Sequence, residues 1–186
     1  FFEAVILLFM ILFATGLAFA QPVGGKRISQ EFVPGQLWLD TDGNPINAHG
    51  GGVLFHEGVY YWYGEFKAGR TFLPDCNKSW GGTRVDMIGV SCYSSTNLYD
   101  WKNQGIVLHA VPDDPKSDLY PGKTLERPKV IYNRMTKRFV MWMHIDSMNY
   151  AAARSGVAIS DKPTGPFKYL GSFRPDAEVW PDNVTS

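Results

Sequence analysis

The chain has 186 residues, of which 45% are hydrophobic and 15% aromatic, and it contains 19 glycines and 12 prolines. This length and composition suffice for one globular domain with many turns and a sizeable core, and they exclude a disordered chain. The 18 basic and 18 acidic residues give a formal net charge of zero, which argues against the basic surface that a nucleic-acid backbone requires.

The chain opens with an apolar segment. Residues 4–20 are mostly apolar and end in the small-x-small triplet Ala18-Phe19-Ala20, and turn-forming residues follow. This pattern predicts a signal peptide over residues 1–20 and an exported protein, extracellular or periplasmic, with no membrane attachment after cleavage. The alternative is a membrane anchor, because the run lies at the lower limit of a spanning helix, ~17–25 residues. The chain begins with Phe1-Phe2-Glu3, without Met or a basic region, so we expect a sequence truncated at its start.

From residue 46 onward the sequence predicts an all-β domain. Short segments rich in Val, Ile, Tyr, Trp and Phe alternate with Gly, Asn-Arg and Pro-Thr-Gly-Pro turns, and no long segment has helical periodicity. The first predicted strand pair covers residues 48–55 and 59–65, and a similar pair covers 126–132 and 139–146. Charged residues stand at the ends of these strands. Because an unpartnered buried charge is costly, we expect such side chains to line a site.

The strands form two similar units of about four strands each. Val53 corresponds to Val130, Gly89 to Gly156 and Trp101 to Phe167. Repeated four-stranded units are typical of a β-propeller, in which one blade cannot bury both of its faces alone. A closed propeller needs at least about four blades, so the sequence predicts an N-terminal portion, residues 21–186, of a longer propeller domain. The alternative is a two-sheet sandwich of the same strands.

The two cysteines, Cys76 and Cys92, allow one disulfide in an oxidising compartment. Cys92 lies in an apolar run, where a free buried thiol is equally compatible with the sequence. Both interpretations stay open.

Several motifs resemble those of the family 43 glycoside hydrolases, and within them the exo-β-1,3-galactanase group. The resemblance extends from about residue 32 to the C-terminus. Each motif alone is weak, but their order along the chain is specific. They are Trp38-Leu39-Asp40-Thr41-Asp42-Gly43, Ala48-His49-Gly50-Gly51-Gly52, Tyr61-Trp62-Tyr63-Gly64-Glu65, Val90-Ser91-Cys92-Tyr93-Ser94-Ser95, Glu126-Arg127-Pro128-Lys129-Val130, Trp142-Met143-His144, and Asn149-Tyr150 with Pro163-Thr164-Gly165-Pro166-Phe167.

The resemblance implies a five-bladed β-propeller, of which about two blades are present, and an enzyme that cleaves O-glycosidic bonds with inversion. An acid protonates the leaving oxygen in such an enzyme, and a second group activates water on the opposite face of the ring. The resemblance places the acid in a later blade, beyond Ser186, so this segment alone should be inactive. In the wider family an Asp that serves as the catalytic base stands where this chain has Ala48-His49-Gly50. This chain shares the absence of that Asp with the galactanase group, and its catalytic base is therefore unassigned.

Several side chains are candidates for sugar binding. The resemblance places Glu126 against the sugar, with an ion pair to Arg127 or Lys129 as the alternative. Glu65 can accept hydroxyl hydrogen bonds or pair with Lys67. His49 precedes glycines that allow close approach, although a crowded propeller axis would also explain those glycines.

Another group of candidates lies on a single predicted strand. Trp142, His144 and Asp146 alternate along it and should therefore share one face. A sugar could stack on the tryptophan while the polar neighbours bind its hydroxyls. The alternative is a His–Asp hydrogen bond of purely structural importance.

Other chemistries have little support. The histidines show no metal-ligand spacing, no Gly-x-Ser-x-Gly elbow is present, and no cofactor is implied. The expected partner is a polysaccharide or oligosaccharide. A non-catalytic carbohydrate-binding propeller, or an arabinosidase or xylosidase of the same family, are the alternative functions.

Overall fold

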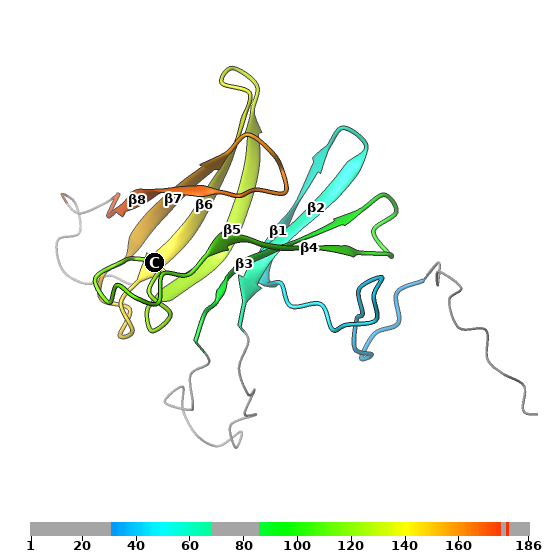
Figure 1. The fold of residues 1–186 in the computed structure, drawn as a ribbon, viewed down its shortest axis with the longest axis horizontal. Helices are drawn as coiled ribbons and strands as arrows, with labels where there is room; N and C mark the ends of the chain where they lie inside the picture. The colour runs from blue at the N-terminus through cyan, green and yellow to red at the C-terminus, as the bar shows by residue number, and fades with distance from the viewer. Residues whose placement is uncertain (1–30, 68–85, 176–177, 179–186) are drawn as a thin grey trace, which may run out of the picture.

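The computed structural model describes residues 31–67, 86–175 and Glu178 (Figure 1). The predicted signal peptide, Cys76 and most of the tail after residue 175 lie outside these residues. Strands, turns and loops make up the described part of the chain, which holds no helix of the length and apolarity that crossing a bilayer requires.

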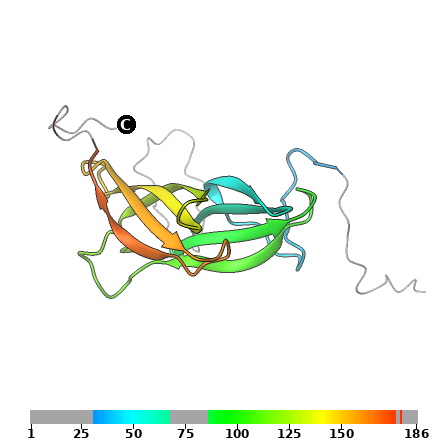
Figure 2. The same ribbon diagram turned by 90° about the horizontal axis from the view of Figure 1, so that it is seen from above.

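Eight strands form two four-stranded antiparallel sheets, in the orders β1-β2-β3-β4 and β5-β6-β7-β8. Figures 1 and 2 show the two sheets side by side, with β5 next to β1. The all-β prediction and the two repeated units are confirmed, and the arrangement fits two blades of a propeller. The strands are β1 (His49–His56), β2 (Val59–Phe66), β3 (Gly89–Ser95), β4 (Lys102–His109), β5 (Thr124–Asn133), β6 (Arg138–Asp146), β7 (Arg154–Ser160) and β8 (Lys168–Phe173).

Period-two alternation explains why these segments form blades. Along β6, alternate side chains from Phe139 to Ile145 are buried in the core, whereas Trp142 between them is exposed. Residues of β3 and β4 belong to the same core, which therefore joins the two sheets. The core includes Tyr63, Val90, Cys92, Val107, Leu108, Leu125, Val130, Phe139, Met141, Met143, Ile145, Ala158 and Phe167.

The opposite face of the first sheet is covered by aromatic side chains. Trp101 packs against Trp62 with ring centroids 5.3 Å apart, and Trp38, from the segment before β1, lies 5.4 Å from Trp62. Trp101 and its counterpart Phe167 are both buried, but Phe167 belongs to the core between the sheets. The repeat therefore places an aromatic residue near the last turn of each sheet, but the two residues pack in different clusters.

Hydrogen bonds also join the sheets. The Tyr63 hydroxyl donates to the Pro163 carbonyl at 2.6 Å, and the Phe167 amide donates to the Val107 carbonyl at 2.7 Å. Burial raises the pKa of Tyr63 above its ordinary value, with smaller contributions from Cys92 and Tyr61. The tyrosine therefore remains a neutral donor at physiological pH.

Cys92 is a free, buried thiol of this core. Burial raises its pKa to about 12, so it is protonated and unreactive at neutral pH. Cys92 therefore has the environment of a small hydrophobic residue, which is one of the two interpretations that the sequence left open. The other cysteine, Cys76, lies outside the described residues.

The first strand of each sheet is bulged near its start. The register with the neighbouring strand shifts between His49 and Gly52 in β1, and between Glu126 and Lys129 in β5. Each bulge contains a residue with left-handed backbone, Gly50 at φ 59° and Arg127 at φ 53°. A bulge changes the direction of the side chains next to it. The side chains next to these two bulges include His49 and Glu126, which are among the candidates for sugar binding.

Candidate functional site

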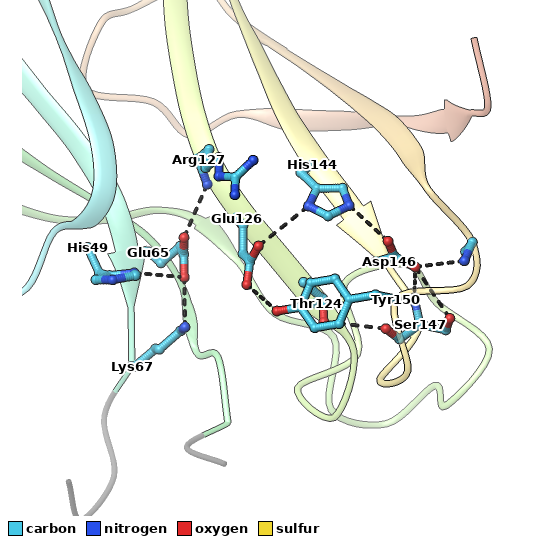
Figure 3. Close-up of polar contacts among 11 residues, drawn as sticks. His49, Glu65, Lys67, Thr124, Glu126, Arg127, His144, Asp146, Ser147 and Tyr150 are labelled. Atoms are coloured by element: carbon cyan, nitrogen blue, oxygen red, sulfur yellow. Dashed lines mark hydrogen bonds and ion pairs between the residues drawn. The ribbon is translucent and has the colours of Figure 1, made fainter. Parts of the chain in front are cut away.

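Five of the six predicted site residues, His49, Glu65, Glu126, His144 and Asp146, gather at one end of the two sheets (Figure 3). Strand pairing places His49 opposite Glu65, and Glu126 opposite His144. The β1–β2 and β5–β6 turns project from the other end (Figure 1). The structure therefore brings together charged groups that lie far apart in the sequence.

Glu65 is held by three donors. Its side chain is 1% exposed, and Lys67 Nζ lies 2.9 Å and His49 Nδ1 3.4 Å from its Oε2 atom. Its Oε1 atom accepts a hydrogen bond of 3.1 Å from the backbone amide of Arg127 in the other sheet. The expected alternative, an ion pair with Lys67, is present. The carboxylate also joins β2 to the bulge of β5.

The backbone near Glu65 is tightly packed. A side chain at Gly50 would place its Cβ atom 2.9 Å from Glu65 Oε1, and one at Gly51 would overlap the Tyr63 carbonyl. Lys129 Nζ donates to the carbonyls of Gly50 and Gly51, at 3.0 and 2.5 Å. These contacts supply the close approach that the glycine run predicted. His49 itself remains 71% exposed and could reach a ligand.

Glu126 has neither of the ion-pair partners considered from the sequence. Its Oε1 atom accepts a 2.5 Å hydrogen bond from the Tyr150 hydroxyl, and its Oε2 atom lies 3.4 Å from His144 Nδ1. The Glu126 side chain is 19% exposed. It is therefore supported by the protein and still partly open.

Tyr150 contacts Glu126 but was not among the candidates for sugar binding, although the resemblance rested partly on this tyrosine. The tyrosine follows β6 in a loop and has left-handed backbone, with φ 55°. Non-glycine residues in this conformation are uncommon and concentrate at functional sites. The unusual backbone turns the phenol toward Glu126, which no strand periodicity could have indicated.

His144 and Asp146 form the hydrogen bond that the sequence suggested as the structural alternative. His144 Nε2 lies 2.9 Å from Asp146 Oδ2. The other carboxylate oxygen of Asp146 accepts the amides of Ser147 and Ala152, at 2.8 and 2.7 Å. The side chain of Asp146 is 2% exposed, so the carboxylate faces protein groups.

The environment of Asp146 favours its charged form. Desolvation by burial acts to raise the pKa of Asp146, but hydrogen bonds from the Ala152 amide, the His144 ring and the Ala153 and Ser147 amides outweigh it. The net result is a pKa below the ordinary value. Asp146 is therefore an anionic acceptor that anchors both His144 and the loop after β6.

Trp142 lies two residues before His144 on the same strand, and its residue is 41% exposed. Its ring meets Phe173 edge-on, with centroids 6.4 Å apart. The strand therefore presents an exposed aromatic ring, as expected, whereas Asp146 at the end of the same row of side chains is buried. Among the residues that the structure describes, no three His, Cys, Asp or Glu side chains are grouped so as to hold a metal ion.

Comparison with known proteins yields matches among solved structures. No protein-family model and no curated protein matches the chain. The GH43 β-1,3-galactosidase BT3683 with galactodeoxynojirimycin is 46% identical, with a TM-score of 0.62, over 74% of this chain and 37% of that one. The exo-β-1,3-galactanase of Clostridium thermocellum is 43% identical, with a TM-score of 0.63, over 79% and 28%.

A third match is the exo-β-1,3-galactanase of Phanerochaete chrysosporium with β-1,3-galactotriose. It is 38% identical, with a TM-score of 0.64, and the match covers 77% of this chain and 30% of that one. The chain thus spans about a third of the length of these proteins. The motifs, the two blades and these identities together show that the chain belongs to family 43 of the glycoside hydrolases and is similar to its exo-β-1,3-galactanases.

Proposed function

We propose that this protein is a glycoside hydrolase that removes galactose from the ends of β-1,3-galactan chains, and that the two described blades supply part of its sugar site. The observation that carries the proposal is the 38–46% identity to enzymes with this activity. The apolar run over residues 4–20 supports export, which would bring the enzyme to a polymeric substrate.

Glu126 is the proposed centre of sugar binding in these blades. An ionised carboxylate has about four lone-pair sites, and Tyr150 and His144 address two of them. The remaining sites can accept sugar hydroxyls at the exposed side of Glu126. Trp142 offers a partly exposed ring against which a sugar can stack, and His49 an exposed donor.

We propose inversion as the stereochemical course and a general acid outside these two blades. Inversion requires two catalytic groups ~6.5–9.5 Å apart, with water between one of them and the sugar. Glu65 accepts hydrogen bonds from three protein groups, and Glu126 accepts one from the Tyr150 hydroxyl. Both carboxylates are therefore placed as hydrogen-bond acceptors, and neither is placed as the proton donor of the reaction. The acid and the water-positioning group would come from elsewhere in the protein.

The test is Glu126→Gln in the full-length protein, assayed on β-1,3-galactan beside arabinan and xylan oligosaccharides. Losing a hydrogen bond from a sugar hydroxyl to a charged acceptor should lower kcat/KM about 10- to 100-fold. The melting temperature should change by less than about 2 °C, because the glutamine can still accept from Tyr150. NMR of the first-released galactose should show the α-anomer, the product of inversion at a β-linkage.

Glu57→Gln is the matched control. Glu57 lies in the β1–β2 turn at the other end of the sheet, and its side chain is 86% exposed. This variant should retain wild-type activity. Normal turnover with a large loss of stability in Glu126→Gln would contradict the sugar-binding role. Release of arabinose or xylose alone would overturn the proposed substrate, and binding without hydrolysis would indicate a carbohydrate-binding propeller.

A further inference from the structure

A buried nitrogen at the site lacks a hydrogen bond. His144 Nδ1 is inaccessible to solvent and has no hydrogen-bond partner, although Glu126 Oε2 is only 3.4 Å away. The opposite ring nitrogen is bound to Asp146 at 2.9 Å. Buried polar atoms in native proteins are rarely unpartnered, so this one calls for a physical explanation.

Both oxygens of Glu126 meet groups that depend on Asp146. One carboxylate oxygen of Asp146 holds the His144 ring, which faces Glu126 Oε2. The other holds the amides of Ser147 and Ala152, which delimit the loop carrying Tyr150. The Tyr150 hydroxyl in turn donates to Glu126 Oε1. A single buried carboxylate therefore fixes two separate supports of Glu126.

The chemistry of these groups determines where the protons lie. Asp146 acts only as an acceptor when ionised, so the ring nitrogen beside it must carry hydrogen. Glu126 is also an acceptor when ionised, and a bare Nδ1 lone pair facing it would be repelled. A proton on Nδ1 turns this repulsion into a charge-assisted attraction. The ring between the two carboxylates is then an imidazolium.

We propose that His144 and Asp146 are positioning residues for Glu126, with the His144 ring protonated at both nitrogens so that Nδ1 holds Glu126 Oε2 while the carboxylate accepts sugar hydroxyls. This inference rests on the proposed function and assigns the pair an indirect role. Asp146 is 2% exposed and both of its oxygens are bound to protein groups, so a direct contact with sugar would break existing bonds.

The groups facing the ring belong to neighbouring elements. Glu126 comes from β5, Asp146 from β6 itself, and Tyr150 from the loop after β6, with its ring centroid 6.0 Å from that of His144. Ser155 of β7 lies opposite His144 in the sheet and carries no charge. The charged groups that face the ring are thus the carboxylates of Glu126 and Asp146, and the Tyr150 hydroxyl is a neutral donor to Glu126.

The first measurement is side-chain ¹⁵N NMR of the full-length protein labelled at histidine. His144→Gln identifies the signals of His144. Both nitrogens of this ring should show the shifts of protonated imidazole at neutral pH, and Glu126→Gln should remove the protonated Nδ1 signal. An unprotonated Nδ1 in the wild type would overturn the inference, and this spectrum needs no active variant.

The second measurement is a double-mutant cycle on kcat/KM with β-1,3-galactan. His144→Leu should lose about tenfold, as expected for one hydrogen bond to a carboxylate, and His144→Asn should recover most of it by presenting an amide near the Nδ1 position. In the Glu126→Gln background, His144→Leu should cause little further loss, because the two residues act together. Additive losses would mean that His144 acts independently of Glu126 and would overturn the inference.

The two hypotheses fail differently. If Glu126→Gln leaves galactan hydrolysis unchanged, the proposed role of Glu126 in sugar binding falls, whatever the cycle shows. If Glu126→Gln is defective but folded His144→Leu is as active as wild type, the positioning inference alone falls.

Discussion

The two sheets carry the same pair of residues with the partners exchanged between strands. In the first sheet the histidine, His49, lies on β1 and Glu65 on β2. In the second the acid, Glu126, lies on β5 and His144 on β6. Each pair has its Nδ1 and Oε2 atoms 3.4 Å apart, and each first strand bulges directly afterwards.

The surroundings separate the two pairs. Glu65 is enclosed by Lys67 and by a backbone amide from the neighbouring sheet, and its histidine points into solvent. Glu126 is partly exposed to solvent. In this pair the histidine, His144, is the enclosed member, and Asp146 binds it from the other side. The two pairs show that one backbone frame can enclose its acid, which then acts as a lock between the two sheets, or leave its acid partly open, as the proposed sugar contact of Glu126 requires. Which of these it becomes depends on which member of the pair is buried.

Removing the lock should have the largest effect on stability. Glu65→Ala would leave Lys67 and the Arg127 amide without their acceptor at the junction of the sheets. Breaking a buried charged pair typically costs ~3–5 kcal/mol, and because Lys67 is partly exposed we expect about 3 kcal/mol here. Chemical denaturation of wild type and variant would measure the difference.

Glu126→Ala provides the matched comparison. Its side chain is more exposed, so the free energy of unfolding should fall by only about 1 kcal/mol. Equal losses for the two acids would contradict the distinction between an enclosed acid that locks the sheets together and an acid that is partly open.

Asp146 gives an effect of intermediate size that depends on pH. Its folded-state pKa lies below its unfolded value, so its stabilising contribution is present above that unfolded value, about 3.9, and is lost as pH falls through the lower folded value. Asp146→Asn should cost about 1–2 kcal/mol at neutral pH, and the difference from wild type should shrink below pH ~4. Unfolding free energies measured between neutral pH and pH ~2 would test this.

Asp161→Asn serves as the control for the acid titration. Asp161 is 79% exposed and pairs with Arg138 at 3.4 Å, so its replacement should change the free energy of unfolding by less than about 1 kcal/mol. A profile for Asp146→Asn that runs parallel to wild type at all pH values would show that the charge of Asp146 contributes nothing.

The bulges should give the smallest effect. Arg127 has the left-handed backbone that Gly50 has in the first sheet. Such a backbone costs a side-chain-bearing residue ~1–2 kcal/mol, and glycine loses ~0.5–1 kcal/mol more entropy on folding than alanine. Arg127→Gly should therefore stabilise the protein by about 1 kcal/mol or less, as measured by thermal unfolding.

The reverse experiment is Gly50→Ala. The added Cβ atom would lie 2.9 Å from Glu65 Oε1 and would occupy the same strained backbone, so this variant should be destabilised. Tolerance of alanine at position 50 would show that the two bulges are not equivalent in conformational demand.

The sequence predicted the blades because alternation and turn residues specify strands locally. Val53 and Val130 mark corresponding strands, and Trp142, His144 and Asp146 follow the expected spacing along β6. Charged residues at strand ends also indicated the end of the sheets at which the site lies. These features depend on near neighbours in the chain, which makes them accessible to pattern analysis.

The partners within the site were not predictable in the same way. Glu126 meets Tyr150 and His144 rather than Arg127 or Lys129, because the bulge at Arg127 changes the direction of the strand. Tyr150 reaches its acceptor through a left-handed backbone in a loop. Both features depend on backbone dihedral angles at non-glycine residues, for which the sequence carries no local signal.

The hydrogen bond between the Tyr63 hydroxyl and the Pro163 carbonyl has a consequence for biosynthesis. Its partners are 100 residues apart in the chain. At the usual translation rates of ~5–20 residues per second, the ribosome needs about 5–20 s to deliver the second partner after the first. During this interval the core-facing side of the first sheet, which includes the Cys92 thiol once that residue is made, lacks all or part of the cover that the second sheet provides. We therefore expect the nascent chain to depend on chaperones until the loop between β7 and β8 has emerged.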